Sequence, residues 1–309
     1  MTQLYTEIKP ETWLELKDWY WALGAGIDWV FRGQQDEKWD ICSSLERAIP
    51  SWWDKGSKKQ KKEIGEFLGY SEEKLFGKFS ERVEQFASLG ETAADTVLGK
   101  LALMQHHGVP TRLIDWTDSP YVATFFAVEN ASDPEAKCAV WAISSQWCQE
   151  KSAMAVRKKL NLKPADFGNH TDFSLDHVLS ETILKGSIPL VAPLRPLKLN
   201  IRIASQQGLF LCQGDLNMNF MENLRSLGEG ELPQMLYKFV FPAHWRPEIF
   251  HDLFNMNIGP QTLFPGLDGF AKSIRLRMVW ETESYDYLDY VRATAAKNFK
   301  VNYFVPSAE

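Results

Sequence analysis

The sequence contains little cysteine and no long apolar run. Its 309 residues include four cysteines, which are scattered and form no Cys-x-x-Cys pair, so the ligand spacing of a zinc site is missing. No run of 18 apolar residues occurs, and the first residues, MTQLYTEIKPETW, contain no basic segment followed by an apolar one. We therefore expect no metal, no membrane partner and a cytoplasmic chain, with Cys138 and Cys212 as buried thiols.

The chain also contains fewer basic than acidic residues. The chain has 34 lysines and arginines against 40 aspartates and glutamates, a net charge of −6. Composition therefore does not predict nucleic acid or an anionic membrane as a partner, although a local basic groove stays open as an alternative. The lysine-rich run Lys55–Lys62 favours a solvated loop and helix start over a phosphate-binding site.

The densest polar pattern lies in LALMQHHGVPTRLIDWTDSPYVATFFAVE, residues 101–129. Both ends are typical of apolar helices, whereas the middle combines histidines, aspartates, threonines and an arginine. Gly108 and Pro110 predict that the first helix ends there, and Ser119-Pro120 predicts the cap and first position of the next helix. We therefore expect a shaped polar site between two buried helices.

A strand is predicted at residues 27–34, where an apolar run closes on Arg32, Gly33 and Gln34. An arginine after four residues of a buried strand is costly unless it emerges into a polar site. The glycine after it permits close approach to the backbone. An edge-strand arginine paired with a carboxylate is an equally good interpretation of these residues.

Helical periodicity dominates the first 130 residues and short strands the middle, which predicts one α+β domain spanning residues 1–309. No internal repeat or linker interrupts it. Predicted helices cover residues 10–23, 43–48, 72–89, 92–106, 121–128, 146–160, 176–184, 242–255, 270–279 and 283–296, with a polar loop at 161–176. Predicted strands cover residues 27–34, 111–116, 139–143, 188–192, 199–203, 207–212 and 237–241.

Two motifs together resemble the FRG domain, a family named for its Phe-Arg-Gly motif and found widely in bacteria and their mobile elements. They are FRGQ at residues 31–34 and QHHGVPTRLIDWTDSP at residues 105–120. RIASQQGLF at 202–210 and LFPGLDG at 263–269 fit the looser C-terminal pattern of the family. The resemblance extends to about residue 270 and is densest at 25–130.

A second, more distant resemblance is to ADP-ribosyltransferases of the arginine–serine–glutamate type. Residues 31–33 are similar to the early-strand arginine element of that family, and residues 116–127 to its second, serine-bearing element. Gln206, ahead of Gly208, is similar to the third element. The resemblance implies a helical N-terminal part packed on a small, mostly antiparallel split sheet, with NAD as the co-substrate.

These resemblances and the polar pattern together define a candidate site. Arg32 would fork onto phosphate or ribose oxygens, Gln206 would hold ribose hydroxyls, and His106 would serve as an acid, a base or a hydrogen-bonding group. Because His106 and His107 are adjacent, at most one faces a given site, and the plain alternative is that they cap the helix end. The expected NAD-binding residues are Arg32, Gly33, Gln34, Gln105, His107, Arg112, Thr117 and Ser119.

Position 206 departs from the transferase pattern, because an active enzyme of that type is expected to carry glutamate there. Glutamine can hydrogen-bond to ribose but cannot act as a base or offset positive charge. Glu181 and Asp215 are candidates to replace that carboxylate.

The sequence thus predicts an NAD-dependent, ADP-ribosyltransferase-like enzyme that modifies a macromolecule or hydrolyses NAD. It would act as a bacterial toxin or phage-defence effector, with a protein or nucleic-acid target and an antitoxin or regulator as a further partner. The alternative is a nucleic-acid-binding or nuclease-like FRG module without NAD chemistry. In that case Arg32, His106, Arg112 and the lysine run would contact nucleic acid.

Overall fold

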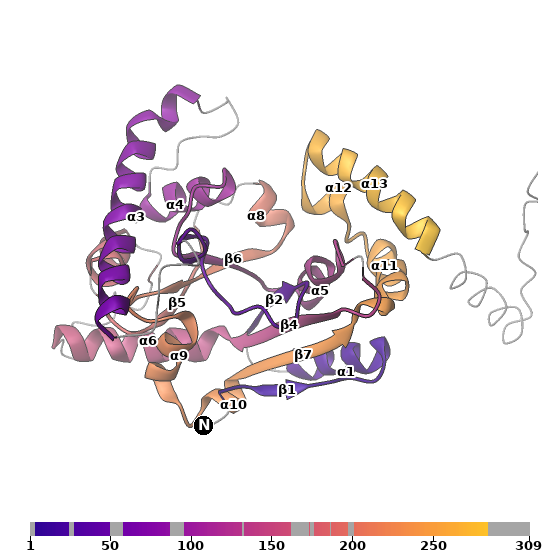
Figure 1. Ribbon diagram of the computed structural model, residues 1–309, viewed down its shortest axis with the longest axis horizontal. Coiled ribbons are helices and arrows are strands. Elements are labelled where there is room, and N and C mark those ends of the chain that lie inside the picture. The colour runs from indigo at the N-terminus through magenta and orange to yellow at the C-terminus, as the bar shows by residue number, and fades with distance from the viewer. Residues whose placement is uncertain are drawn as a thin grey trace, which may run out of the picture.

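A computed structural model describes residues 4–24, 28–49, 58–86, 96–131, 133–161, 173, 176–185, 187–196 and 201–283 of the chain. Within them, a seven-stranded sheet has the order β1-β7-β4-β2-β3-β6-β5 (Figure 1). All neighbouring strands are antiparallel except β1 and β7. The strands are β1 (Thr6–Ile8), β2 (Trp29–Gln34), β3 (Leu113–Thr117), β4 (Lys137–Ser144), β5 (Val191–Leu194), β6 (Gly208–Gln213) and β7 (Leu236–Pro242).

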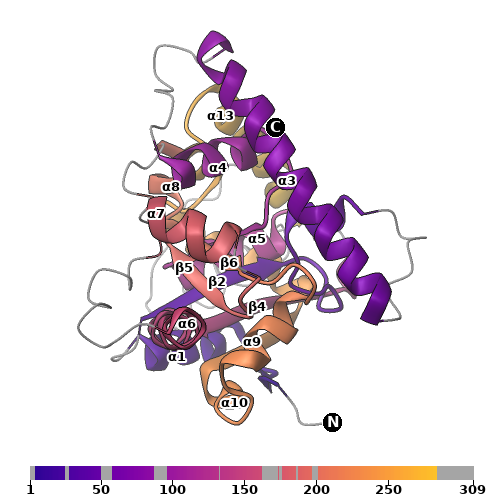
Figure 2. The same cartoon turned by 90° about the vertical axis from the view of Figure 1, so that its left-hand side faces the viewer.

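Helices cover both faces of the sheet (Figures 1 and 2). None of those described is long and apolar enough to cross a membrane. The α-helices are α1 (Trp13–Leu23), α2 (Ser44–Arg47), α3 (Lys58–Phe86), α4 (Val97–His106), α5 (Pro120–Val128), α6 (Ser145–Leu160), α7 (Asp176–Val178), α8 (Ile201–Ser205), α9 (Phe220–Gly228), α10 (Leu232–Met235), α11 (Arg246–Asn255), α12 (Pro260–Leu263) and α13 (Leu267–Glu283). A π-helical segment, η2 (Leu179–Leu184), follows α7, and a 3₁₀ turn, η3 (Ala243–Trp245), precedes α11.

Two large apolar cores lie on the sheet. Because side chains alternate along β2, this strand contributes side chains to both cores. Trp29 and Phe31 point into a core shared with α1, α5 and α11, whereas Val30 points into a core shared with α4, α6 and α9. Successive side chains of a strand face opposite sides, so one short apolar strand can be buried on both faces. This double burial explains why β2 begins as a continuous apolar run.

The sheet nearly divides between β2 and β3. β2 pairs with β4 along all of Trp29–Gln34, but it pairs with β3 at one position, Phe31 with Thr117. Beyond that pair the two strands diverge. The sheet therefore consists of a β1-β7-β4-β2 half and a β3-β6-β5 half joined at a single point.

The α+β class and the mostly antiparallel sheet agree with the sequence-based prediction, but several assignments were wrong or missing, and helices α9, α10 and α12 were not predicted. The predicted strand at 199–203 gives way to helix α8, whose turn is closed by hydrogen bonds from Ser205 Oγ to the Ile201 oxygen (2.7 Å) and from the Gln206 nitrogen to the Arg202 oxygen (3.0 Å). Alternating Ile-Arg-Ile had favoured a strand. Strand β1 was missed because its three residues are too few to show a period.

Helix boundaries differ in one important place. Helix α3 runs for 29 residues, Lys58–Phe86, and so begins well before the helix predicted at 72–89. The end of the lysine-rich run is the start of this helix, as predicted. The predicted polar loop at 161–176 and the predicted helix at 283–296 lie almost wholly outside the described residues.

Gly33 sits where α5 touches the sheet. A Cβ atom built on Gly33 would lie 2.0 Å from the main-chain oxygen of Ala123 and 2.7 Å from the main-chain nitrogen of Ala127. Both distances are far below van der Waals contact, and the obstructing atoms are backbone atoms. The helix can therefore pack on β2 only if residue 33 has no side chain.

We predict that Gly33→Ala destabilises the fold, because strand β2 or helix α5 must shift to admit one methyl group. Overpacking of this kind costs about 1–3 kcal/mol. Urea denaturation should show a lower midpoint. Gly69→Ala is the control, since Gly69 lies in α3 and a Cβ there meets no atom within 4 Å; the gain in helix propensity should leave its stability unchanged or slightly higher. Equal stability of the two variants would contradict this account of Gly33.

Candidate functional site

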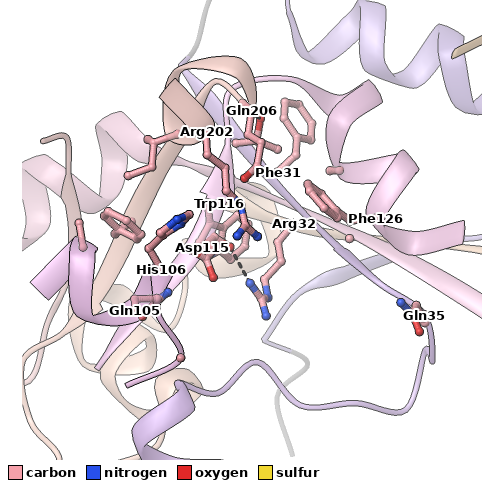
Figure 3. Close-up of a pocket in the computed structure, with 17 residues that line it drawn as sticks. Phe31, Arg32, Gln35, Gln105, His106, Asp115, Trp116, Phe126, Arg202 and Gln206 are labelled. Atoms are coloured by element: carbon pink, nitrogen blue, oxygen red, sulfur yellow. Dashed lines mark hydrogen bonds between the residues drawn. The ribbon is translucent and has the colours of Figure 1, made fainter. Parts of the chain in front are cut away.

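A pocket of about 400 Å³ opens where β2 and β3 diverge. This volume falls within the range of roughly 300–1,000 Å³ found for small-molecule sites. Its walls come from β2, β3, β6, α4, α5 and α8, so residues far apart in the sequence meet here (Figure 3). The lining residues are Phe31, Arg32, Gly33, Gln35, Ala102, Gln105, His106, Gly108, Asp115, Trp116, Thr117, Ala123, Phe126, Arg202, Ile203, Gln206 and Phe210.

Arg32 spans the gap between the two halves of the sheet. Its Nη1 donates a hydrogen bond to the main-chain oxygen of Asp115 on β3, at 2.6 Å (Figure 3). Its Nε is buried and has no hydrogen-bond partner among the described residues. Burial lowers the pKa of the guanidinium, and the Asp115 carboxylate partly opposes that effect. An arginine that stays protonated at neutral pH thus lies in the pocket with incomplete charge compensation.

Helix α8 contributes a second cation. The guanidinium of Arg202 lies over the ring of Phe264, 4.8 Å from its centroid, and Lys272 of α13 lies 4.0 Å from the same centroid. Cation–π contact holds a positive charge in place without neutralising it. Lys272 also approaches Glu129, at 3.9 Å. The pocket wall is therefore positively charged on the Arg32 side and on the Arg202 side.

Gln206, one helical turn after Arg202, connects the pocket to α12. Its Nε2 donates to the main-chain oxygen of Leu263 at 3.0 Å, and its own main-chain oxygen accepts from Thr117 Oγ1 at 2.7 Å. A glutamate at 206 would set a carboxylate, which has no hydrogen to donate, against that carbonyl oxygen. An amide therefore suits the contact at position 206 better than a carboxylate does.

The last turn of α4 forms the wall that contains Gln105 and His106. Gln105 Oε1 accepts a hydrogen bond from the Thr111 hydroxyl. Gly108, with φ of 77°, reverses the chain: its nitrogen donates to the Gln105 oxygen, and the Val109 nitrogen donates to the Met104 oxygen. This pair of bonds is a Schellman motif, which confirms the predicted glycine-terminated helix end. Of the two histidines, His106 lines the pocket and His107 is exposed outside it.

Thr117 and Ser119 have different roles. Thr117 lines the pocket, donates to Gln206 and accepts from the Ser119 nitrogen at 3.1 Å. Ser119 lies outside the lining and caps α5, where its Oγ accepts from the Val122 nitrogen at 3.3 Å. The Ser-Pro pair is thus the predicted helix start, and its hydroxyl is used by the helix itself.

Arg112 also lies outside the pocket, in a buried ion pair. Its Nε donates to Glu72 Oε2 at 2.6 Å, its main-chain nitrogen donates to Glu72 Oε1 at 2.9 Å, and its Nη1 donates to the Ile183 oxygen at 3.0 Å. Both side chains of the pair are almost fully buried, with 3% and 5% of their surfaces exposed. The cofactor-binding role expected of Arg112 therefore gives way to a structural one, the attachment of α3 to β3.

Gln34 is turned away from the pocket as well. It is buried, accepts from Trp141 Nε1 at 2.7 Å and donates to the Asp40 oxygen at 3.2 Å. Six of the ten residues predicted for the site line the pocket: Arg32, Gly33, Gln105, His106, Thr117 and Gln206. Gln34, His107, Arg112 and Ser119 do not.

The carboxylate in the pocket is not one that the sequence had indicated. Glu181 is exposed and pairs with Lys185 at 2.7 Å, and Asp215 accepts from the nitrogens of Asn217, at 2.9 and 2.6 Å. Neither lines the pocket, whereas Asp115 does. Arg202 was missed too, although its spacing from Gln206 places both on one face of a helix.

Metal and thiol chemistry find little support in the described residues. They contain no group of three or more histidine, cysteine or acidic side chains arranged to hold a metal ion. Cys138 and Cys212 are buried, as expected, and burial raises the pKa of each thiol to about 12. Neither is a thiolate at neutral pH.

We predict that Glu72→Gln strongly destabilises the protein while leaving the pocket residues in place. The change removes the negative charge from a buried arginine, and breaking a buried ion pair costs about 3–5 kcal/mol. Glu66→Gln provides the control, because Glu66 lies on the same helix in an exposed pair with Lys62 and should change stability by less than about 1 kcal/mol. Chemical denaturation of both variants tests this, and similar midpoints would argue against a structural role for the pair.

Among the comparisons with known proteins, a family model matches part of the chain. No curated protein and no solved structure matches the chain. A family model matches residues 27–136, a range that includes β2, α4, β3 and α5 and therefore much of the pocket wall. That family is the FRG domain.

Proposed function

We propose that the pocket binds NAD and that the chain is an ADP-ribosyltransferase-like enzyme, which transfers ADP-ribose to a macromolecule or hydrolyses NAD. The observation that carries the proposal is the convergence of Arg32, Thr117 and Gln206 on one pocket. They come from three separate segments, in the order that the transferase resemblance implies. The proposal includes the wider role expected from the sequence, that of a bacterial toxin or phage-defence effector with a protein or nucleic-acid target.

The charge distribution in the pocket suits a dinucleotide. A diphosphate carries negative charge, and Arg32 and Arg202 both line the pocket without a carboxylate within 4.0 Å among the described residues. A planar guanidinium matches phosphate oxygens in a bidentate geometry. The apolar rings of Phe126 and Phe210 supply the surface on which a flat base or nicotinamide ring packs.

The nucleic-acid alternative loses the support of Arg112 and of the described part of the lysine run. Lys59, Lys61 and Lys62 each form an ion pair, with Glu63 at 3.9 Å, Glu222 at 2.7 Å and Glu66 at 3.7 Å respectively. Arg112 is buried against Glu72 and is not available to a phosphate backbone. The described cations of the lysine run thus belong to a charge-balanced helix surface, and NAD chemistry is the better-supported proposal.

We predict that Arg32→Ala weakens NAD binding by about ten- to one-hundred-fold, which corresponds to one or two hydrogen bonds from a charged group. Isothermal titration calorimetry measures binding, and release of nicotinamide from NAD measures turnover. Arg225→Ala is the matched control, because Arg225 is exposed on α9, pairs with Glu229 at 3.7 Å and does not line the pocket.

Both variants should remain folded at the temperature of the binding experiment, although Arg32→Ala should unfold at a somewhat lower temperature because it loses the hydrogen bond to Asp115. Thermal unfolding therefore separates loss of binding from loss of fold. An unmodified chain that shows no heat of binding and no nicotinamide release, alone or with protein and nucleic-acid acceptors, would refute the proposed function. Equal affinity of Arg32→Ala and Arg225→Ala would remove Arg32 from the site.

A further inference from the structure

Cleavage of NAD requires a negatively charged group in the pocket. When the glycosidic bond breaks, positive charge develops on the ribose carbon, and a preorganised negative charge beside it stabilises the transition state. Gln206 cannot supply that charge, since its side chain is a neutral amide and its nitrogen is engaged with Leu263. A carboxylate must therefore come from another element of the fold.

We propose that Asp115 is the catalytic carboxylate of this site. The assignment rests on the proposed function and names the residue that performs its central step. Asp115 is the one acidic residue among the described residues that line the pocket. Its neighbours Ile114 and Trp116 are buried, whereas Asp115 itself is exposed.

The strand geometry supports this assignment. In β3, side chains alternate, so Asp115 and Thr117 lie on the same face, and both line the pocket. The cross-strand partner of Asp115 is Phe210 of β6, which also lines the pocket. The carboxylate thus lies on a rigid, paired strand rather than on a loop, which is the support that a catalytic group requires.

The backbone of Asp115 is fixed from the other side by Arg32. The Nη1 of Arg32 donates to the main-chain oxygen of Asp115 at 2.6 Å, and no ion pair within 4.0 Å occupies the Asp115 carboxylate among the described residues. One residue of β3 therefore uses its backbone to position the arginine and leaves its side chain available to the ligand. The site places its negative charge beside the cations that would hold the diphosphate.

The reaction needs no reagent besides NAD and a hydroxyl group of water or of the acceptor. The bond between the ribose carbon and the nicotinamide nitrogen breaks, and its electron pair neutralises the pyridinium ring, so nicotinamide leaves uncharged. The ribose carbon becomes oxocarbenium-like, and the Asp115 carboxylate stabilises it. A hydroxyl of water or of the macromolecular acceptor then forms the new bond to that carbon, and its proton passes to Asp115 or to solvent.

We predict that Asp115→Asn reduces nicotinamide release by about one-hundred-fold or more, the scale on which a single electrostatic stabiliser acts. NAD affinity should change by less than about fivefold, because asparagine keeps the shape of the side chain and the backbone oxygen that Arg32 contacts. Asp115→Glu should retain more turnover than Asp115→Asn, since it restores the charge. Asp118→Asn is the control: Asp118 is exposed, pairs with Arg195 at 2.7 Å and lies outside the pocket lining.

The two proposals fail in distinguishable ways. If the unmodified chain binds and cleaves NAD and Asp115→Asn cleaves it equally well, the role of Asp115 is overturned and the proposed function stands. If the unmodified chain neither binds nor cleaves NAD, the proposed function falls, and the role of Asp115 with it. Thermal unfolding of Asp115→Asn close to that of Asp118→Asn, together with retained NAD affinity, shows that a loss of turnover is chemical rather than structural.

Discussion

The hydrogen bond from Arg32 to the main-chain oxygen of Asp115 holds the candidate site together. β2 and β3 share a single residue pair, so the strand edges beyond it have backbone groups that a continuous sheet would have paired. The arginine supplies a hydrogen bond to the Asp115 carbonyl across the opening between the two strands. The pocket thus lies at a gap between two neighbouring strands of one sheet.

Each of the three residues of the Phe-Arg-Gly motif meets a different structural requirement. Phe31 is buried in the apolar core beneath α5, Arg32 turns into the pocket, and Gly33 lets the backbone of α5 come within contact distance of the strand. Any larger residue at 33 would displace the helix whose residues Ala123 and Phe126 line the pocket. The short motif therefore couples core packing, site chemistry and helix placement.

Sequence reasoning succeeded where a local rule determined the outcome. The glycine at 108 and the Ser-Pro pair at 119 and 120 marked helix ends because capping depends on adjacent residues. Motif order placed Thr117 and Gln206 in one predicted site, and both line the same pocket. Arg112 was misjudged because its partner, Glu72, lies 40 positions away on a different helix, and no local pattern announces a buried ion pair. The sequence did not single out Asp115 as a pocket residue, because its access to the pocket depends on where two strands separate.

The ring of Phe264 connects the pocket wall with helix α13 in the C-terminal part of the described chain. Arg202 of the pocket wall and Lys272 of α13 both rest against it, at 4.8 and 4.0 Å. An anion that draws Arg202 toward the pocket would alter this shared contact, and a movement of α13 would in turn change the position of a pocket cation. If occupancy of the pocket changes this contact, thermodynamic linkage requires that the docking of α13 change the affinity of the pocket by the same factor. In that case the position of α13, the last described helix, would affect ligand binding in the pocket.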